Sequence, residues 1–321
     1  MQEFIYASLA SFVISIALLF LLTRRRLLGF ALDQPNARSL HTKPVPRTGG
    51  IGILCGILAG WALSGLPGWP VIAGMSILVF VSFLDDVMSL PVTIRFGVHF
   101  VAAGLFAVPV LLPSIGWIWT CVSMIFIVWM INLYNFMDGS DGLAGGMALF
   151  GFLFYAIAAW MHHSPEFVLL NMIVSMSACS FLFFNFHPAK IFMGDSGSIP
   201  LGFLAAAFGF AGWNRDLWPL WFPFLVFSPF IVDATVTLLK RLLRGEKIWQ
   251  AHREHYYQRL IRAGLGHRNT ALLEYALMVS VGATAVLSLR MSAPWIALGI
   301  WVFAYPVLML KIDRLWAAQD K

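Results

Sequence analysis

The sequence predicts an all-α protein that crosses a membrane many times. Of its 321 residues, 60% are hydrophobic and only 11% are charged, whereas a soluble globular chain carries about 25% charged residues. A second observation is that apolar runs able to cross, or nearly cross, a hydrocarbon core of about 30 Å follow one another along the chain. The third is that basic residues gather in alternate gaps between these runs. Together these observations are typical of an integral membrane protein.

Eleven apolar runs define the predicted helices, and the chain shows no internal repeat. The runs are 3–22, 49–65, 68–84, 96–113, 115–131, 142–161, 165–185, 198–213, 217–239, 271–289 and 293–310. Because 49–65 and 198–213 are short and begin with glycine-rich sequence, their boundaries are the least sharp. We expect one integral-membrane domain, residues 1–321, in which 240–270 is a basic cytoplasmic loop.

The distribution of basic residues predicts the orientation of the chain. Cytoplasmic gaps are enriched in Lys and Arg, and every Lys and Arg except Arg215 and Arg290 lies in the longer gaps or the C-terminal tail. These segments are therefore expected in the cytoplasm, with the N-terminus outside and the C-terminus inside. Arg24–Arg26 follow the first run, which is typical of a membrane helix rather than a signal peptide. The net charge of +6 then reflects topology and a lipid bilayer, not a nucleic-acid partner.

Two adjacent carboxylates, Asp85 and Asp86, follow the run 68–84 on the cytoplasmic side. Neighbouring side chains on a helix point about 100° apart, so both can line one cavity. Two acids in a cleft of low dielectric repel each other unless a divalent cation or a base neutralises them. The pair therefore predicts magnesium binding, general-base chemistry or both, and solvated acids at the membrane interface are the alternative.

A second polar segment follows the run 115–131 and has a polar residue at every third position. These residues are Asn132, Asn135, Asp138 and Asp141. On one straight helix the first and the last would point in opposite directions. Gly139 and Gly142 instead predict that the helix ends here, so that the later acids turn back toward Asn135. Amide and carboxylate oxygens suit Mg²⁺ and the hydroxyls of a nucleotide or sugar; a helix cap with incidental polar residues is the alternative.

Three further segments carry candidate residues. Asp195 precedes the run 198–213, where it can cap the helix or help to receive a phosphate. The loop 33–50 contains Lys43 and Arg47, which either face a phosphate or only satisfy topology.

The third candidate segment is the basic stretch 252–259, in which four residues follow helical spacing. His252, His255, Tyr256 and Arg259 would share one face of a helix. This face predicts capture of a diphosphate. An amphipathic helix on the membrane surface is one alternative, and zinc is another, although no third ligand is nearby.

These motifs, in this order, resemble the polyprenyl-phosphate N-acetylhexosamine-1-phosphate transferase family, bacterial glycosyltransferase family 4. The matching pieces are the loop 33–50, Asp85-Asp86 with Arg95, Asn132 to Gly146, Phe192 to Gly202, and Asp233 with His252 to His255. The resemblance implies transfer of a sugar 1-phosphate from a UDP-N-acetylhexosamine to undecaprenyl phosphate, with release of UMP, at the cytoplasmic face of the bacterial inner membrane. A homodimer is compatible with it.

The resemblance also assigns roles by motif position. It assigns catalysis to Asp85 and Asp86. It assigns Mg²⁺, or Mn²⁺ as a substitute, to Asn135 and Asp195. The residues assigned to substrate binding are Asn132, Asp138, Asp141, Lys43, Arg47, His252, Arg253 and His255.

Two positions depart from the family pattern. Ser89 stands where many relatives have a third acid, and residues 252–255 read His-Arg-Glu-His rather than the denser histidine cluster of the peptidoglycan-precursor branch. The chain therefore looks more like the O-antigen-initiating branch than a phospho-muramyl-pentapeptide transferase. The donor sugar and the identity of the base stay open. A lipid-linked sugar transporter is the alternative from another class, and the clustering of acids at one face disfavours it.

Overall fold

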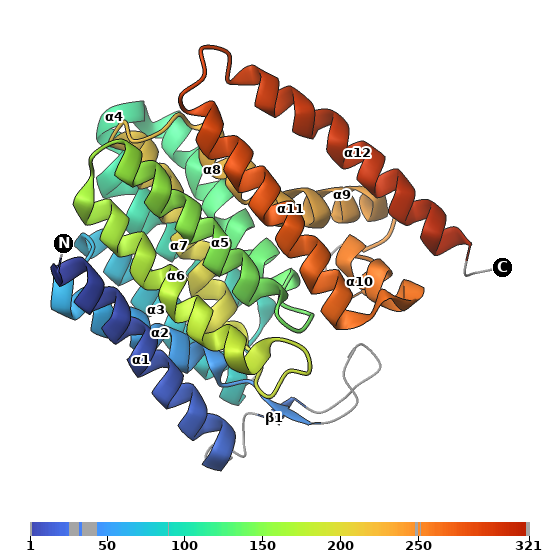
Figure 1. Cartoon of the computed structure of the whole chain (residues 1–321), viewed down its shortest axis with the longest axis horizontal. Helices are drawn as coiled ribbons and strands as arrows, with labels where there is room; N and C mark the ends of the chain where they lie inside the picture. Colours follow the sequence, from blue (N-terminus) through green and yellow to red (C-terminus); the bar gives the residue numbers. More distant parts are fainter. Residues whose placement is uncertain are drawn as a thin grey trace.

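The computed structural model describes residues 2–25, 32–33, 44–88, 90–247, 250 and 252–318, which form a bundle of α-helices with a two-stranded ribbon (Figure 1). The elements are α1 (Gln2–Arg25), β1 (Leu32–Asp33), β2 (Val45–Pro46), α2 (Gly49–Ser64), α3 (Trp69–Met88), α4 (Val92–Phe136), α5 (Leu143–Met161), α6 (Pro165–Asn185), α7 (Asp195–Asn214), α8 (Trp221–Val226), α9 (Ser228–Leu243), α10 (Tyr256–Leu260), the π-helix η1 (Ile261–Leu265), α11 (Gly266–Ser288) and α12 (Trp295–Ala317). The first and last helices lie at opposite edges of the bundle (Figure 1).

The helices confirm an all-α, multi-pass membrane protein. Within the described residues, seven helices are long and apolar enough to cross a membrane, and two shorter apolar helices cover Gly49–Ser64 and Trp69–Asp85. The runs 96–113 and 115–131 both lie in α4, which is broken at Gly116, where φ is 72°. Glycine adopts this conformation without a steric penalty. The number of spans and the orientation of the chain stay predictions.

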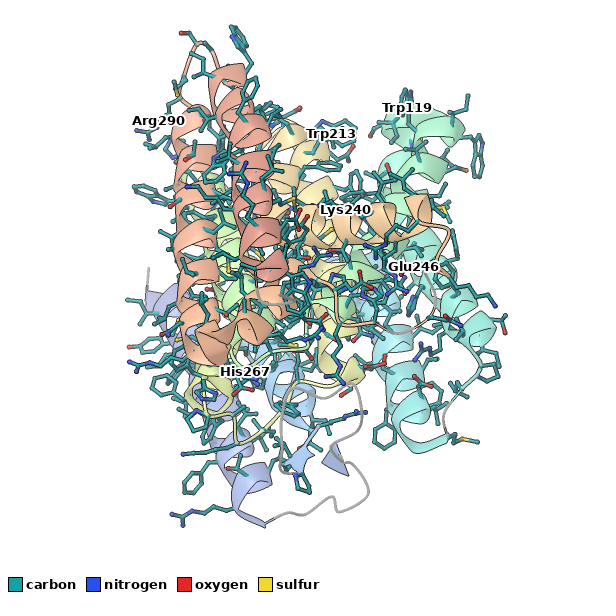
Figure 2. All side chains as sticks on the ribbon, turned by 90° about the vertical axis from the view of Figure 1, so that its right-hand side faces the viewer. Trp119, Trp213, Lys240, Glu246, His267 and Arg290 are labelled. Atoms are coloured by element: carbon teal, nitrogen blue, oxygen red, sulfur yellow. The ribbon has the colours of Figure 1, made fainter. Side chains whose placement is uncertain are left out.

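The predicted run 217–239 is wrong as a single continuous helix. It is divided into α8 and α9 around Phe227, and Pro229 stands in the first turn of α9. Proline lacks a backbone N–H and fits the start of a helix better than its interior. Helix α9 runs across the direction of α11 and α12, as Figures 1 and 2 both show. The expected loop 240–270 is correspondingly structured, because it contains α10 and η1.

Helix α7 is the most buried of the candidate membrane spans in the described chain. Inside the molecule, 89% of its apolar 18-residue stretch is buried. It packs against α2, α3 and α4. A Cβ atom on Gly50 would lie 2.4 Å from the backbone nitrogen of Gly197, so α2 and α7 meet backbone to backbone. The N–H groups of Gly49 and Gly50 donate to the carbonyls of Phe192 and Met193 at 2.9 and 2.8 Å. This contact fixes the loop before α2 beside the start of α7.

We expect Gly50→Ala to lower stability, because the added methyl group has no space at the contact between α2 and α7. Overpacking of this kind costs about 1–3 kcal/mol. Gly299→Ala in α12 is the matched control, since a Cβ there meets nothing within 4 Å. Thermal unfolding of both variants in the same detergent measures the difference. Equal melting temperatures for the two variants would contradict the proposed tight crossing.

Candidate active site

Three of the predicted acidic motifs meet where α3, α4 and α7 begin or end. Asp85 lies in the last turn of α3, and Asp195 is the first residue of α7. Arg95, near the start of α4, joins them: its Nη1 lies 2.6 Å from Asp85 Oδ2 and 3.6 Å from Asp195 Oδ2. The other Asp85 oxygen accepts a hydrogen bond from the Leu90 N–H at 2.7 Å. One guanidinium therefore links two helices through their carboxylates.

Asn135 and Asp138 complete this acid cluster from the end of α4. The Asn135 side-chain oxygen, Oδ1, accepts from the Ser198 hydroxyl at 2.8 Å, and the same side chain hydrogen-bonds to Asp195. The Gly194 N–H donates to Asp138. Gly194 has a φ of 72°, and a Cβ there would lie 2.6 Å from the Arg47 carbonyl oxygen, so the close approach requires glycine.

The electrostatics of the acid cluster favour a cation. Burial, together with the Asp195 carboxylate, raises the pKa of Asp138 well above its usual range, while Arg47 and the Gly194 amide act in the opposite direction. The side-chain oxygens of Asn135 and Asp195 are the kind of hard ligand that suits Mg²⁺. Within the described chain, no group of three or more His, Cys, Asp or Glu residues is arranged around a metal position. Bound Mg²⁺ ordinarily keeps several waters and phosphate oxygens as ligands, so this donor set fits it.

Asp141 makes its polar contacts with groups other than those of the acid cluster. Its Oδ2 atom lies 2.6 Å from His187 Nδ1 and 3.2 Å from the Ala189 N–H, and its Oδ1 atom lies 3.8 Å from His267 Nδ1. The two imidazole rings are stacked, with centroids 5.5 Å apart. The predicted end of the helix is confirmed, because α4 stops at Phe136. Asp141 then connects this turn to the loop before α7 and to the start of α11.

Asn132 makes its hydrogen bonds within α4. Its Nδ2 atom donates to the Val128 carbonyl at 2.7 Å and lies 3.2 Å from His99 Nδ1. The side chain therefore connects the two halves of α4.

The segment His252–Arg259, here called the histidine segment, departs from the predicted helix. Helix α10 begins only at Tyr256, so the expected single helical face across 252–259 is wrong. The reason is Asp233 of α9, whose two oxygens accept from the N–H groups of Tyr256 and Tyr257 at 2.9 and 3.0 Å. This carboxylate satisfies the first amides of α10 and fixes where the helix starts. The rings of His252 and His255 remain close, with centroids 4.8 Å apart.

Tyr257 brings the histidine segment to the edge of the acid cluster. Its hydroxyl donates to the Phe136 carbonyl at 3.1 Å. A Cβ on Gly139 would lie 2.2 Å from that hydroxyl, so the contact depends on glycine. The His255 ring stacks on Tyr257, with centroids 5.9 Å apart. Phe136, whose carbonyl Tyr257 binds, lies two residues before Asp138 in the chain.

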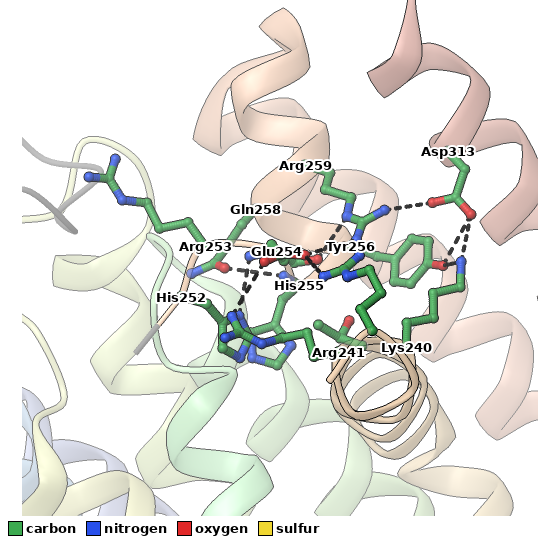
Figure 3. Close-up of polar contacts among 12 residues, drawn as sticks. Lys240, Arg241, His252, Arg253, Glu254, His255, Tyr256, Gln258, Arg259 and Asp313 are labelled. Atoms are coloured by element: carbon green, nitrogen blue, oxygen red, sulfur yellow. Dashed lines mark hydrogen bonds and ion pairs between the residues drawn. The ribbon is translucent and has the colours of Figure 1, made fainter. Parts of the chain in front are cut away.

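The basic residues of the histidine segment differ in protonation state and in the direction in which their side chains extend. Burial, followed by the charges of His255 and Arg241, lowers the pKa of His252 to about 4, so its imidazole is neutral at pH 7. Arg253 extends away from the other labelled residues of the segment (Figure 3). Arg47 is exposed, and its positive charge attracts the carboxylates of both Asp138 and Asp195. Lys43 and the side chain of Asp86 lie outside the described residues.

Two residues that shape this site were not identified from their local sequence alone. Arg95 was noted only through the family resemblance, although it is the one basic residue in the gap that holds Asp85. That isolated charge was a usable signal. Tyr257 carried no signal, because its contact with Gly139 joins segments far apart in the sequence.

Comparisons with known proteins agree with this geometry. The family model for glycosyl transferase family 4 matches residues 69–212. The probable undecaprenyl-phosphate N-acetylglucosaminyl 1-phosphate transferase of Bacillus subtilis (strain 168) is 31% identical over 303 residues, which covers 89% of this chain and 84% of the relative. The decaprenyl-phosphate N-acetylglucosaminephosphotransferase of Mycolicibacterium smegmatis is 31% identical over 293 residues, with 76% and 72% covered. The undecaprenyl-phosphate alpha-N-acetylglucosaminyl 1-phosphate transferase of Escherichia coli (strain K12) is 26% identical over 312 residues, with 89% and 84% covered.

The segment matched by the family model includes the helix ends that carry Asp85, Asn135 and Asp195. The similarity to the Bacillus protein extends over 89% of the chain. The chain therefore belongs to the polyprenyl-phosphate N-acetylhexosamine-1-phosphate transferase family.

Proposed function

We propose that the protein transfers N-acetylhexosamine 1-phosphate from a UDP-sugar to undecaprenyl phosphate and releases UMP. The observation that carries this proposal is the convergence of Asp85, Asn135, Asp138 and Asp195 with Arg95 at neighbouring helix ends. Because the names of the relatives specify N-acetylglucosamine, UDP-N-acetylglucosamine is the first donor to test. The lipid would approach from the bilayer and the nucleotide from the cytoplasm.

The proposed reaction exchanges one phosphate–oxygen bond for another. An oxygen of the lipid phosphate attacks the phosphorus that bears the sugar, and the bond from that phosphorus to the bridging oxygen breaks. UMP leaves with the electron pair of that bond. Phosphoryl transfer depends mainly on positioning and on neutralising charge. Arg47 and Arg95 lie beside the acids that would receive the diphosphate, and they would bind its oxygens.

The two adjacent acids take different parts in the proposal. Both Asp85 oxygens already accept hydrogen bonds, from Arg95 and from the Leu90 N–H. Asp85 would therefore orient Arg95, and Asp86 stays the candidate base toward the lipid phosphate. Asn135 and Asp195 would hold Mg²⁺, or Mn²⁺ in its place. When bound, the cation would neutralise the diphosphate and the departing phosphate of UMP.

The remaining assignments concern the donor and the cellular role. His255 and Arg253 would contact the diphosphate or the sugar, and neutral His252 would contribute a hydrogen bond rather than a charge. Asp141 would act through His187 and His267, whose rings flank it. We propose that the product starts a lipid-linked glycan such as O-antigen at the bacterial inner membrane.

The reaction is tested by UMP release from purified protein with undecaprenyl phosphate and a panel of UDP-N-acetylhexosamines and UDP-muramyl-pentapeptide, with and without Mg²⁺. We expect release from UDP-N-acetylglucosamine, and loss of release when EDTA removes the cation. A folded protein that releases no UMP from any donor, but moves lipid-linked sugar across liposomes, would refute the enzyme and favour a transporter.

Replacing one predicted metal ligand should abolish most of the activity. Asp195→Asn keeps the shape of the side chain but removes the charge beside Arg95 and Asn135. We expect kcat to fall at least about 100-fold, the scale seen when a group that stabilises charge in the transition state is removed. The melting temperature and membrane insertion of the variant serve as controls for folding. Full activity of well-folded Asp195→Asn would remove its assignment to the metal.

The neutral state of His252 predicts how stability depends on pH. Its pKa is lowered from 6.5 to about 4 in the folded protein, so the unfolded chain takes up the proton first as the pH falls. The stabilising effect of the neutral ring is therefore present above pH 6.5 and is lost between pH 6.5 and about 4. We expect the melting temperature of the wild-type protein to fall more steeply over this range than that of His252→Gln. Parallel curves for the two proteins would contradict the lowered pKa.

A further inference from the structure

The C-terminal helix contacts the histidine segment through one carboxylate. Asp313 of α12 accepts from Lys240 Nζ at Oδ2 and from Arg259 Nη1 at Oδ1, each at 2.7 Å. The Tyr256 hydroxyl lies 3.4 Å from Oδ2 and itself accepts from Lys240 at 2.5 Å. Figure 3 shows the carboxylate bridging the lysine and the arginine, with the tyrosine ring between them. A carboxylate with two cationic partners makes charge-assisted hydrogen bonds, which are stronger than neutral ones.

The helix that carries Asp313, α12, is otherwise little covered by protein. Only 6% of the apolar 18-residue stretch of α12 is buried inside the molecule, and the helix lies at the edge of the bundle (Figure 1). A second polar contact of α12 is made by Tyr305, whose hydroxyl lies 2.6 Å from the Ser228 hydroxyl. Near the C-terminal end of α12, the Arg262 guanidinium lies over the Trp316 ring, 4.5 Å from its centroid. The polar end of α12 is thus fixed to the chain that follows α9, although its apolar surface faces outward.

Arg259 transmits the contact to the backbone of the histidine segment. Its side chain is only 10% exposed. Its Nε atom donates to the backbone carbonyl of Glu254 at 2.8 Å. The carboxylate of Glu254 is more distant than that of Asp313, because its Oε2 atom lies 3.8 Å from Arg259 Nη2. Without Asp313, a nearly buried guanidinium would lose its close acid, which is costly. The carbonyl that Arg259 binds belongs to the residue immediately before His255.

From His255 the contacts continue to the acid cluster. The His255 ring lies 3.3 Å from Asp233 through its Nδ1 atom and stacks on Tyr257. Tyr257 in turn binds the Phe136 carbonyl beside Asp138. The histidine segment is therefore held on one side by Asp233 and on the other by Asp313.

We infer that Asp313 is a positioning residue, which acts through Arg259 and Lys240 to hold the histidine segment against the sugar-diphosphate side of the active site. This inference rests on the proposed function, and Asp313 itself does not touch substrate. Because UMP lacks the second phosphate and the sugar, its binding should depend less on the histidine segment than binding of the UDP-sugar does. The residue therefore affects the donor selectively, rather than the fold as a whole.

The test compares Asp313→Asn, which loses the charge, with Asp313→Glu, which retains it. Glu166→Gln is the matched control, because it removes an acid paired with Arg215 at 3.4 Å in an exposed contact elsewhere. In Asp313→Asn we expect the KM for UDP-N-acetylglucosamine to rise about tenfold, the scale of one lost hydrogen bond to a charged group. The KM for undecaprenyl phosphate and the affinity for UMP should stay within about twofold, and Asp313→Glu should recover part of the loss.

Hydrogen exchange of the backbone amides in residues 252–260, measured without substrate, gives a second readout. We expect faster exchange in Asp313→Asn, near wild-type exchange in Asp313→Glu, and no change in Glu166→Gln. Unchanged exchange in Asp313→Asn, or equal losses of UMP and UDP-sugar affinity, would overturn the inference. Faster exchange with an unchanged donor KM would also overturn it, because the segment would then move without consequence for the donor. If the wild-type protein releases no UMP, the proposed function fails, and the exchange data still judge the Asp313 contact separately.

Discussion

Partly buried carboxylates at the edge of a membrane must be neutralised, and the arrangement of the helix ends in this protein follows from that constraint. A carboxylate in a low-dielectric setting is stable only with a cation or with several hydrogen-bond donors. Arg95 lies between Asp85 and Asp195 and so joins α3 to α7. Asp138 receives the N–H of Gly194 instead, and this requires a backbone conformation that suits glycine. The contacts that neutralise the acids are thus the same contacts that hold the helix ends together.

The convergence of these acids was predictable because it depends on local signals. Apolar runs identify the helices, and the charges between them assign Asp85, Asn135 and Asp195 to one face of the membrane. The end of α4 was predictable as well, because Gly139 and Gly142 interrupt the helical pattern. Each of these inferences needs only the few residues around the motif. The all-α fold and the placement of Asp85, Asn135 and Asp195 at the ends of α3, α4 and α7 therefore follow from the sequence.

Other contacts depend on residues far away in the sequence, and no local pattern reveals them. Asp141 shares the three-residue spacing of its neighbours, yet it binds His187 because the chain turns at Gly142. The helical spacing of 252–259 was misleading, because Asp233 caps the first amides of α10 and the preceding residues stay outside the helix. Asp313 resembles an ordinary charge in a basic tail until the fold brings it to Arg259.

Aspartate thus has two roles in this protein, one structural and one in the acid cluster, and the two differ in which groups neutralise the carboxylate. Asp233 and Asp313 are matched by amides, Lys240 and Arg259 of the protein itself, so they can fix the backbone whether or not a ligand is bound. In the acid cluster, burial and the neighbouring Asp195 raise the pKa of Asp138 despite Arg47. That cluster is therefore short of positive charge. Under the proposed reaction, a diphosphate would add negative charge to the same place, so we expect the donor to bind there together with a divalent cation.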